Sequence, residues 1–148
     1  MDYAVRAAIE LAAARQKGDD PVKGETIAEA QGIPVKFLEN ILGELKHSGI
    51  VASRRGIEGG YLLAKPAKDV PLAEIIRAVE GPMASVRGEG PEAVEYGGKA
   101  TELQRVWIAV RANLRAVLDT VTLEDLVEGK LPKPVLALSE PGEAWEPR

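Results

Sequence analysis

Residues 24–47 read GETIAEAQGIPVKFLENILGELKH, and their pattern is the main indicator of the fold. Apolar residues recur at helical spacing on both sides of Gly32, and Pro34 stands where a new helix would begin. A helix-turn-helix needs a glycine in its tight turn and apolar residues at fixed offsets around it. With Gly32 in the turn, the offsets are met by Ile27, Ala28, Ile33, Leu38 and Ile41. The pattern predicts helices over residues 24–31 and about 34–47, with an ordinary helical hairpin as the competing interpretation.

The second of these helices has two unlike faces. Its apolar face consists of Phe37, Leu38, Ile41, Leu42 and Leu45, and its other face of Lys36, Glu39, Asn40, Gly43, Lys46 and His47. We therefore expect one face in the core and the other in solvent.

The hydrophobic period changes after Gly49. Residues 50–54 are typical of a strand, residues 55–60 of a glycine-rich turn and residues 61–63 of a return strand. A helix-turn-helix followed by a hairpin is a winged helix. Arg54 and Arg55 lie at the hairpin tip, where an arginine can enter a narrow minor groove. A solvated turn with two exposed arginines is the alternative.

The residues on both sides of the predicted winged helix are expected to be mostly helical. Apolar spacing predicts helices over residues 2–16 and 71–80, the latter opened by Pro71 and stopped by Gly81-Pro82. Residues 82–99 are rich in glycine and proline, which predicts a loop. A last short helix over residues 122–127 has Thr122 as its cap and Asp125 at the third position, a variant of the capping box.

Residues 101–119 form the longest periodic stretch. One continuous stripe follows the predicted helix: Leu103, Val106, Trp107, Val110, Leu114, Val117 and Leu118. Such a stripe at the end of a small domain needs a partner surface, although packing on its own domain is the alternative. The fold class expected is mainly α with a small β-wing: a winged helix-turn-helix domain over 1–80, a linker loop and dimerisation helix over 81–129, and a flexible C-terminal tail over 130–148.

Composition excludes several function classes. The 148 residues include no cysteine and one histidine, His47, which argues against thiolate-held metals, a cysteine nucleophile and a Ser-His-Asp triad. The net charge is −4; residues 1–66 are neutral, so the excess of acid lies in the second half. A polyanion partner should therefore meet the first half.

Catalysis and membrane association are not expected. Glu89, Glu92 and Glu95 crowd one loop but lack a basic or metal partner, so we predict no enzyme active site and no cofactor. No apolar run is long enough to span a membrane or is typical of a signal peptide, so we expect a cytoplasmic protein with no membrane partner.

A set of motifs in chain order resembles the Rrf family of bacterial winged-helix transcriptional regulators, of the IscR, NsrR and CymR type. The resemblance covers about residues 2–128. It rests on Asp2-Tyr3-Ala4-Val5-Arg6-Ala7, Ile27-Ala28-Glu29 with Gly32-Ile33, Phe37-Leu38-Glu39, Leu45, Gly49-Ile50-Val51, Arg55-Gly56, Gly59-Gly60-Tyr61-Leu62-Leu63-Ala64, Ile75-Ile76-Arg77-Ala78-Val79-Glu80-Gly81-Pro82, Trp107 and Val121-Thr122-Leu123-Glu124-Asp125-Leu126.

The resemblance implies a homodimer that binds double-stranded DNA at a palindromic operator. The long helix would cross its twin, and each recognition helix would enter a major groove. The family pattern maps Lys36, Phe37, Glu39 and Asn40 onto DNA-facing positions and Arg55 into the minor groove. Asparagine suits adenine, glutamate suits cytosine N4, and lysine suits guanine or phosphate. Phe37 could instead belong to the core.

Two departures from the family pattern change what is expected. Cluster-binding members carry three cysteines in the loop before the dimerisation helix, whereas residues 82–99 have none and Gln104 falls where some members supply histidine. The chain is therefore expected to be a cysteine-free member without an iron–sulfur cluster, closer to the branch that represses cysteine metabolism and senses through a protein partner. Members also usually begin several residues earlier with a basic segment, so either the native N-terminus is longer, which we expect, or the chain lacks an N-terminal phosphate-binding arm.

The function expected is a dimeric, sequence-specific DNA-binding transcriptional regulator, a repressor without a cluster. The alternative is a winged-helix protein-interaction module, or a regulator whose DNA binding is controlled by a protein partner. Whether an effector is a protein or a small molecule stays open.

Overall fold

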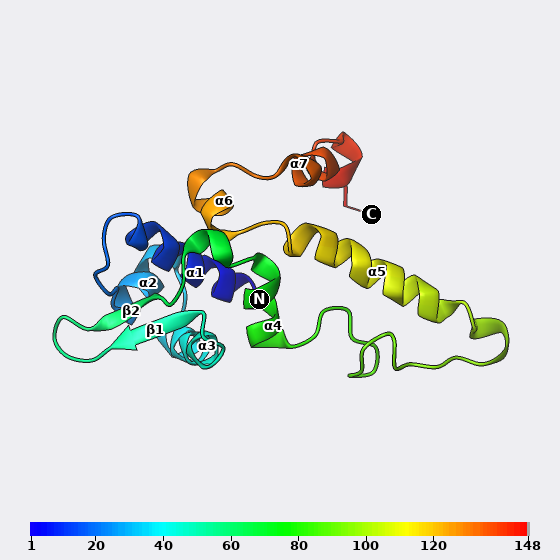
Figure 1. The fold of residues 1–148 in the computed structure, drawn as a ribbon, viewed down its shortest axis with the longest axis horizontal. Helices are drawn as coiled ribbons and strands as arrows, with labels where there is room; N and C mark the ends of the chain where they lie inside the picture. The colour runs from blue at the N-terminus through cyan, green and yellow to red at the C-terminus, as the bar shows by residue number, and fades with distance from the viewer. Residues whose placement is uncertain (148) are drawn as a thin grey trace.

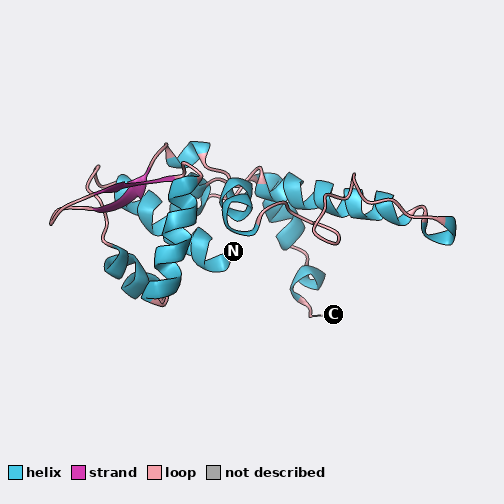
Figure 2. Cartoon of the chain, turned by 90° about the horizontal axis from the view of Figure 1, so that it is seen from below, coloured by secondary structure: helices cyan, strands magenta, loops and turns pink. Residues whose placement is uncertain are grey.

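The computed structural model describes residues 1–147. The chain is mainly helical, with one two-stranded antiparallel sheet (Figures 1 and 2). In chain order the elements are α1 (Asp2–Arg15), α2 (Gly24–Gln31), α3 (Val35–His47), β1 (Val51–Arg54), β2 (Gly60–Leu63), η1 (Ala67–Asp69), α4 (Leu72–Glu80), η2 (Gly98–Ala100), α5 (Leu103–Leu118), α6 (Leu123–Glu128), α7 (Lys133–Ser139) and η3 (Gly142–Trp145). The expectation of a winged helix-turn-helix with a small β-wing and a long following helix is confirmed.

The core forms around α1, which contacts α2, α3, α4, α6 and β2. Its buried side chains are mostly alanines, Ala4, Ala7, Ala8 and Ala12, together with Leu11. Because alanine is small, the neighbouring elements approach the α1 backbone closely. Leucines and isoleucines of those neighbours fill the surrounding space, including Ile27, Leu38, Leu42, Leu45, Ile75 and Leu123.

The helix-turn-helix closes at Gly32, as the sequence predicts. Gly32 has a φ of 61°, in the left-handed region that glycine adopts without steric cost. The next residue, Ile33, donates its backbone N–H to the Ala28 carbonyl at 2.9 Å and is itself buried. This closure ends α2 and turns the chain into α3, which begins one residue after Pro34.

The wing is fixed to the body through a backbone bridge. Strands β1 and β2 pair from Val51 opposite Leu63 to Arg54 opposite Gly60. Val22 joins this sheet by a reciprocal pair of backbone hydrogen bonds with Tyr61, at 2.8 and 2.7 Å. At Gly60 the φ is 152°, and a Cβ would lie 2.5 Å from the Val22 carbonyl oxygen, so this close approach requires glycine.

Residues 81–121 leave the body and return to it at one place (Figure 1). The Leu72 N–H donates to the Val121 carbonyl at 2.9 Å, and the Leu123 N–H donates to the Val70 carbonyl at 3.0 Å. Between these ties, the glycine-rich loop runs out and α5 runs back. The capping box predicted at Thr122 and Asp125 is present and starts α6, which packs on α1.

One segment and one side chain differ from the sequence prediction. Beyond Gly129, where a tail was expected, the chain forms the helix α7 and the short turn η3; Arg148, the last residue of that expected tail, lies outside the described residues. The side chain of Phe37, expected among the apolar residues of its helix, is 64% exposed. Over residues 1–147, the helices are too short or too polar to cross a membrane.

Candidate nucleic-acid interface

The outer face of α3 carries four exposed side chains that the sequence analysis singles out: Lys36, Phe37, Glu39 and Asn40. They lie on the same helix as Leu38, Leu42 and Leu45, which are buried and fix α3 against α1. Within residues 1–147, the side chains of Lys36, Glu39 and Asn40 make no hydrogen bond or ion pair. Their donors and acceptors therefore remain available to an external partner.

Phe37 belongs to this outer face rather than to the core. Its place in the helical pattern predicts burial, but Leu38 and Leu42 already occupy the inner face with almost no exposure. An exposed phenylalanine beside Lys36 and Asn40 offers an apolar contact of the kind that thymine methyl groups accept. The core interpretation of Phe37 is wrong.

The two wing arginines have different surroundings. The Arg54 guanidinium donates to the backbone carbonyl of Asp19 at 3.3 Å, which directs it toward the segment between α1 and α2. In the described residues, 1–147, Arg55 forms no hydrogen bond or ion pair and is exposed. Ile57, at the tip beside it, is 88% exposed. Arg55 is thus the wing arginine with a free guanidinium.

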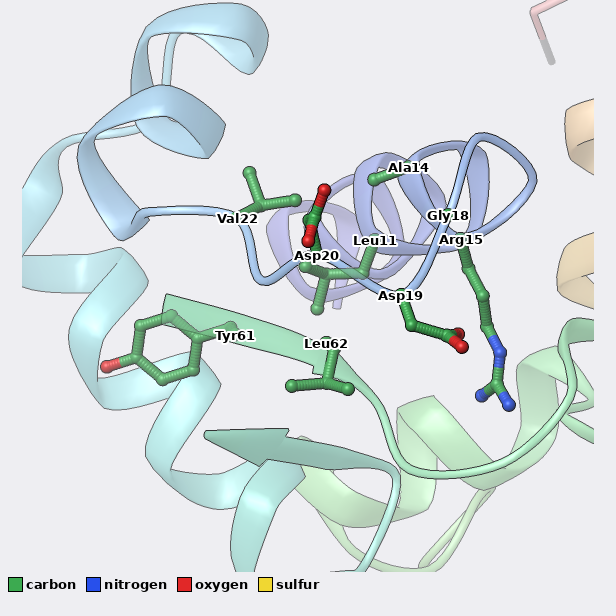
Figure 3. Close-up of a pocket in the computed structure, with 9 residues that line it drawn as sticks. All are labelled: Leu11, Ala14, Arg15, Gly18, Asp19, Asp20, Val22, Tyr61 and Leu62. Atoms are coloured by element: carbon green, nitrogen blue, oxygen red, sulfur yellow. The ribbon is translucent and has the colours of Figure 1, made fainter. Parts of the chain in front are cut away.

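Arg15 of α1 holds the base of the wing, beside the pocket whose lining side chains Figure 3 shows. Arg15 donates to the carbonyls of Leu63 at 3.0 Å and Lys65 at 2.8 Å, where the chain leaves β2. Leu11 and Arg15 of α1, Val22, and Tyr61 of β2 line a pocket here of about 10 Å³. A cavity of that volume holds at most one water molecule, so it is a packing detail and no ligand site.

A second candidate surface lies on α5. In this helix, all of which falls in the described part of the chain, no residue is buried. Val106, Ile108, Val110 and Leu114 are between 39% and 49% exposed. Several of them face an open groove of about 1170 Å³ whose other walls come from Met1, the end of α4, residues 81–85 and Leu138 of α7. The stripe predicted from the sequence is present, and within residues 1–147 its Val106, Val110 and Leu114 stay exposed.

The loop before α5 is tied to that helix by Gln104. Its Nε2 donates to the carbonyls of Pro91 at 3.2 Å, Glu92 at 3.3 Å and Val94 at 2.8 Å. Sequence reasoning did not find this role, because a glutamine that binds backbone carbonyls leaves no sequence pattern.

Two further contacts hold the same loop. The Trp107 indole donates its N–H to the Tyr96 hydroxyl at 3.0 Å. Glu92 forms an ion pair with Arg111, so the expectation that this glutamate lacks a basic partner is wrong. A backbone hydrogen bond to the Glu92 carboxylate and the hydrogen bond from Arg111 lower the pKa of Glu92 below its ordinary value.

Comparison with known proteins places these features in a family. A family model described as "Rrf2: Iron-dependent Transcriptional regulator" matches residues 1–129. The chain is 43% identical over 145 residues to the HTH-type transcriptional regulator Rv1287 of Mycobacterium tuberculosis, covering 98% of this chain and 89% of that protein.

Two solved structures are similar in fold. CymR, the global cysteine regulator of B. subtilis, aligns with a TM-score of 0.71 and 32% identity, covering 86% of this chain and 92% of that one. IscR of T. potens aligns with a TM-score of 0.66 and 31% identity, covering 99% of this chain and 88% of that one.

The family description implies iron, and the residues of this chain do not fit it. Thiolate ligands are absent because the chain has no cysteine. Across residues 1–147, no three His, Cys, Asp or Glu side chains gather where they could hold a metal ion. In the loop itself, the Glu92 carboxylate is engaged by Arg111, and the Gln104 amide is engaged by three carbonyls. This donor set suits neither an iron–sulfur cluster nor a mononuclear iron site.

Proposed function

The chain belongs to the Rrf2 family of transcriptional regulators, and on that premise we propose that it is a homodimeric, sequence-specific DNA-binding repressor that works without an iron–sulfur cluster. Family membership makes the chain a regulator and not an enzyme, and it implies DNA binding. The observation that carries the proposal is the outer face of α3, whose unpaired polar side chains lie beside a wing with a free arginine.

The recognition helix is α3. Its 13 residues are about 20 Å long, and a helix fits the major groove of B-DNA. Asn40 suits a bidentate contact to adenine, Glu39 accepts from cytosine N4, and Lys36 reaches guanine or a phosphate. Phe37 supplies the apolar contact. These four side chains read base edges, while Arg55 enters the adjacent minor groove and Arg54 supports the wing at its edge.

The dimer forms through α5. An amphipathic helix that has no fully buried residue within residues 1–147 gains stability when a twin covers the exposed part of its stripe. Two copies related by a two-fold axis would present two α3 helices to half-sites about 34 Å apart, which calls for a palindromic operator.

Regulation does not depend on a bound cluster. The absence of thiolates and the engagement of Glu92 and Gln104 within the loop support this. Protein purified anaerobically with iron and sulfide should be colourless, and its DNA binding should not respond to nitric oxide or iron chelators. A stoichiometric cluster spectrum after that treatment would contradict this part of the proposal.

A protein-interaction module is the second candidate, because residues 1–66 carry as many acidic as basic residues. Such balance gives a weak general attraction to DNA, and binding would then rest on a few specific contacts. The same neutrality is compatible with control by a protein partner or a small-molecule effector.

One experiment separates the two candidates. Fragments of the parent genome that the full chain retains are sequenced, and the recovered site is used in gel shifts at several salt concentrations. We expect tight, salt-sensitive binding to a palindrome, and loss of base discrimination at one position per half-site in Asn40→Ala. Lys68→Ala, exposed on η1, is the control and should bind as wild type. Retention of no common site would favour the interaction module.

A further inference from the structure

We propose that residues 130–147, called the arm below, pack on α5 of a second copy of the chain, and that this second α5 lies in the groove that the arm forms with the α5 of its own chain. The proposal rests on the dimer argued above and extends it to a segment outside the matched family region, which ends at residue 129. The arm comprises α7, η3 and their flanking residues.

The arm is a preformed unit with an uncovered apolar surface. Pro132 and Pro134 set the first turn of α7, a position that tolerates proline. The Trp145 indole donates its N–H to the Ser139 carbonyl at 2.6 Å, which folds η3 back onto α7. Three large apolar side chains nevertheless remain open, because Leu136 is 38%, Leu138 62% and Trp145 77% exposed.

The arm borders the groove that the second copy would fill. Leu138 lines that groove together with Val106, Val110 and Leu114 of α5. In Figures 1 and 2 the arm lies beside α5, apart from the winged-helix body, and its extensive contacts are between α7 and η3. A second α5 lying in the groove therefore meets Leu138, because that side chain is part of the wall.

Charge complementarity supports the same contact. Helix α5 carries three arginines and no acidic residue, whereas residues 139–147 carry three glutamates and no basic residue. Arg105 of α5 is 83% exposed despite its pairing with Glu102, so its guanidinium retains donors for a further acid. The arm also carries Lys130 and Lys133 at its start, so the favourable charge pairing with α5 is confined to its end, residues 139–147.

Interface area also favours a contribution from the arm. A stable interface buries about 800 Å² on each partner. Helix α5 is about 24 Å long, and two such helices that cross at one point touch over only part of that length. The arm adds the most exposed leucine in the described residues and an exposed tryptophan, the side-chain type that contributes most often at interface centres.

Sedimentation equilibrium on full-length variants tests the contribution of the arm. Leu138→Glu should raise the dimer dissociation constant by about tenfold to a hundredfold, since a leucine is replaced by a charge at a buried contact. Trp145→Ser should act in the same direction. The matched control is Ala137→Glu, which adds the same charge to an exposed neighbour that does not line the groove. Equal dissociation constants for Leu138→Glu and Ala137→Glu would overturn the proposal.

Cross-linking tests whether the arm reaches the second copy, and the absence of native cysteine makes it unambiguous. A tagged chain with Leu138→Cys is mixed with an untagged chain with Val110→Cys and oxidised. We expect a covalent dimer of one tagged and one untagged chain. If instead a single chain with both substitutions closes an internal disulfide and the mixture gives no mixed dimer, the arm packs on its own α5 and the proposal fails.

The same data separate this inference from the proposed function. If Val110→Glu with Leu114→Glu abolishes the dimer while Leu138→Glu leaves it unchanged, the proposed contact of the arm is wrong and the proposed α5 dimer is supported. If the wild-type chain is monomeric at all concentrations, both fail.

Discussion

Helices α3 and α5 are both amphipathic, yet within residues 1–147 only α3 of the two has buried residues. In α3, Leu38, Leu42 and Leu45 are at most 1% exposed, and α1, α2 and α4 contact the helix. In α5, which the structure describes throughout, no residue is buried. The same hydrophobic period thus builds a core in one region and leaves an open surface in the other.

This difference in burial determines which face of each helix is available to a partner. Because α3 is fixed by its inner leucines, its outer face can hold Lys36, Glu39 and Asn40 at defined positions for base contacts. The apolar face of α5 has no buried residue, which is the basis for the dimer proposed above. Four predictions test this contrast.

The largest effect is expected on α5. Replacing Val110 and Leu114 together with glutamate should convert the dimer to a monomer, because two unpaired charges in a packed interface cost about 3–5 kcal/mol each. Light scattering measures the change, and circular dichroism checks that the body stays folded. The double variant Ala112→Glu with Ala116→Glu, at exposed α5 positions that do not line the groove, is the control. If the variant with Val110→Glu and Leu114→Glu stays dimeric, the assignment of α5 to the dimer interface is wrong.

A core deletion in α3 should act on folding instead of association. Leu42 is fully buried, so Leu42→Ala should lower the free energy of unfolding by about 2–5 kcal/mol. Urea denaturation at two protein concentrations measures it. The loss in Leu42→Ala should be the same at both concentrations, whereas Val110→Ala should destabilise through dimer dissociation and depend on concentration. Concentration dependence that is the same for both variants would remove the distinction between the helices.

Substitutions on the outer face of α3 and in the wing, which are proposed to contact DNA, should have smaller effects that depend on the base sequence. Arg55→Ala should cost about 1–3 kcal/mol of binding free energy, most at operators with A·T-rich flanks. Arg54→Ala should cost less, since Arg54 is already drawn to the Asp19 carbonyl. Asn40→Ala should lose discrimination at one base pair and keep the salt slope, since it neutralises no phosphate. Binding of the three variants to the operator and to its single-base variants measures these effects. If Arg54→Ala binds DNA more weakly than Arg55→Ala, the wing register is wrong.

The smallest effect is expected where the loop meets α5. Because the pKa of Glu92 is lowered in the folded chain, its ionised form stabilises the loop above the ordinary glutamate pKa, and this contribution is lost as the pH falls through the lowered value. The fluorescence of Trp107, isolated by Trp145→Phe, should therefore change in acid as the loop loosens. Glu92→Gln should abolish that pH dependence, and a retained transition would assign it to another group.

Much of the winged helix could be predicted from local signals. Gly32, the apolar offsets around it and the change of period after Gly49 each require a particular backbone, so they identify the turn, α3 and the wing directly. The capping box at Thr122 is equally local. The six candidate DNA contacts came from the family resemblance and residue chemistry, and their roles stay predictions.

The remaining features depend on tertiary packing, which a helical pattern does not contain. Phe37 matches the apolar period of α3, but the inner face is already filled by Leu38 and Leu42. Pro132 and Pro134 predict a break, yet both occupy positions at the start of α7 where no intrahelical N–H is needed. The hydrogen bonds of Gln104 become visible only when the loop lies along α5.

The exposed stripe of α5 has a consequence for how many copies of the protein a cell must hold. If two chains must join before a palindrome can be bound, operator occupancy at low abundance rises with the square of the chain number. A modest change in synthesis or proteolysis then gives a disproportionate change in transcription. Under the proposed dimer, the protein's own copy number would act as a regulatory input in addition to any effector.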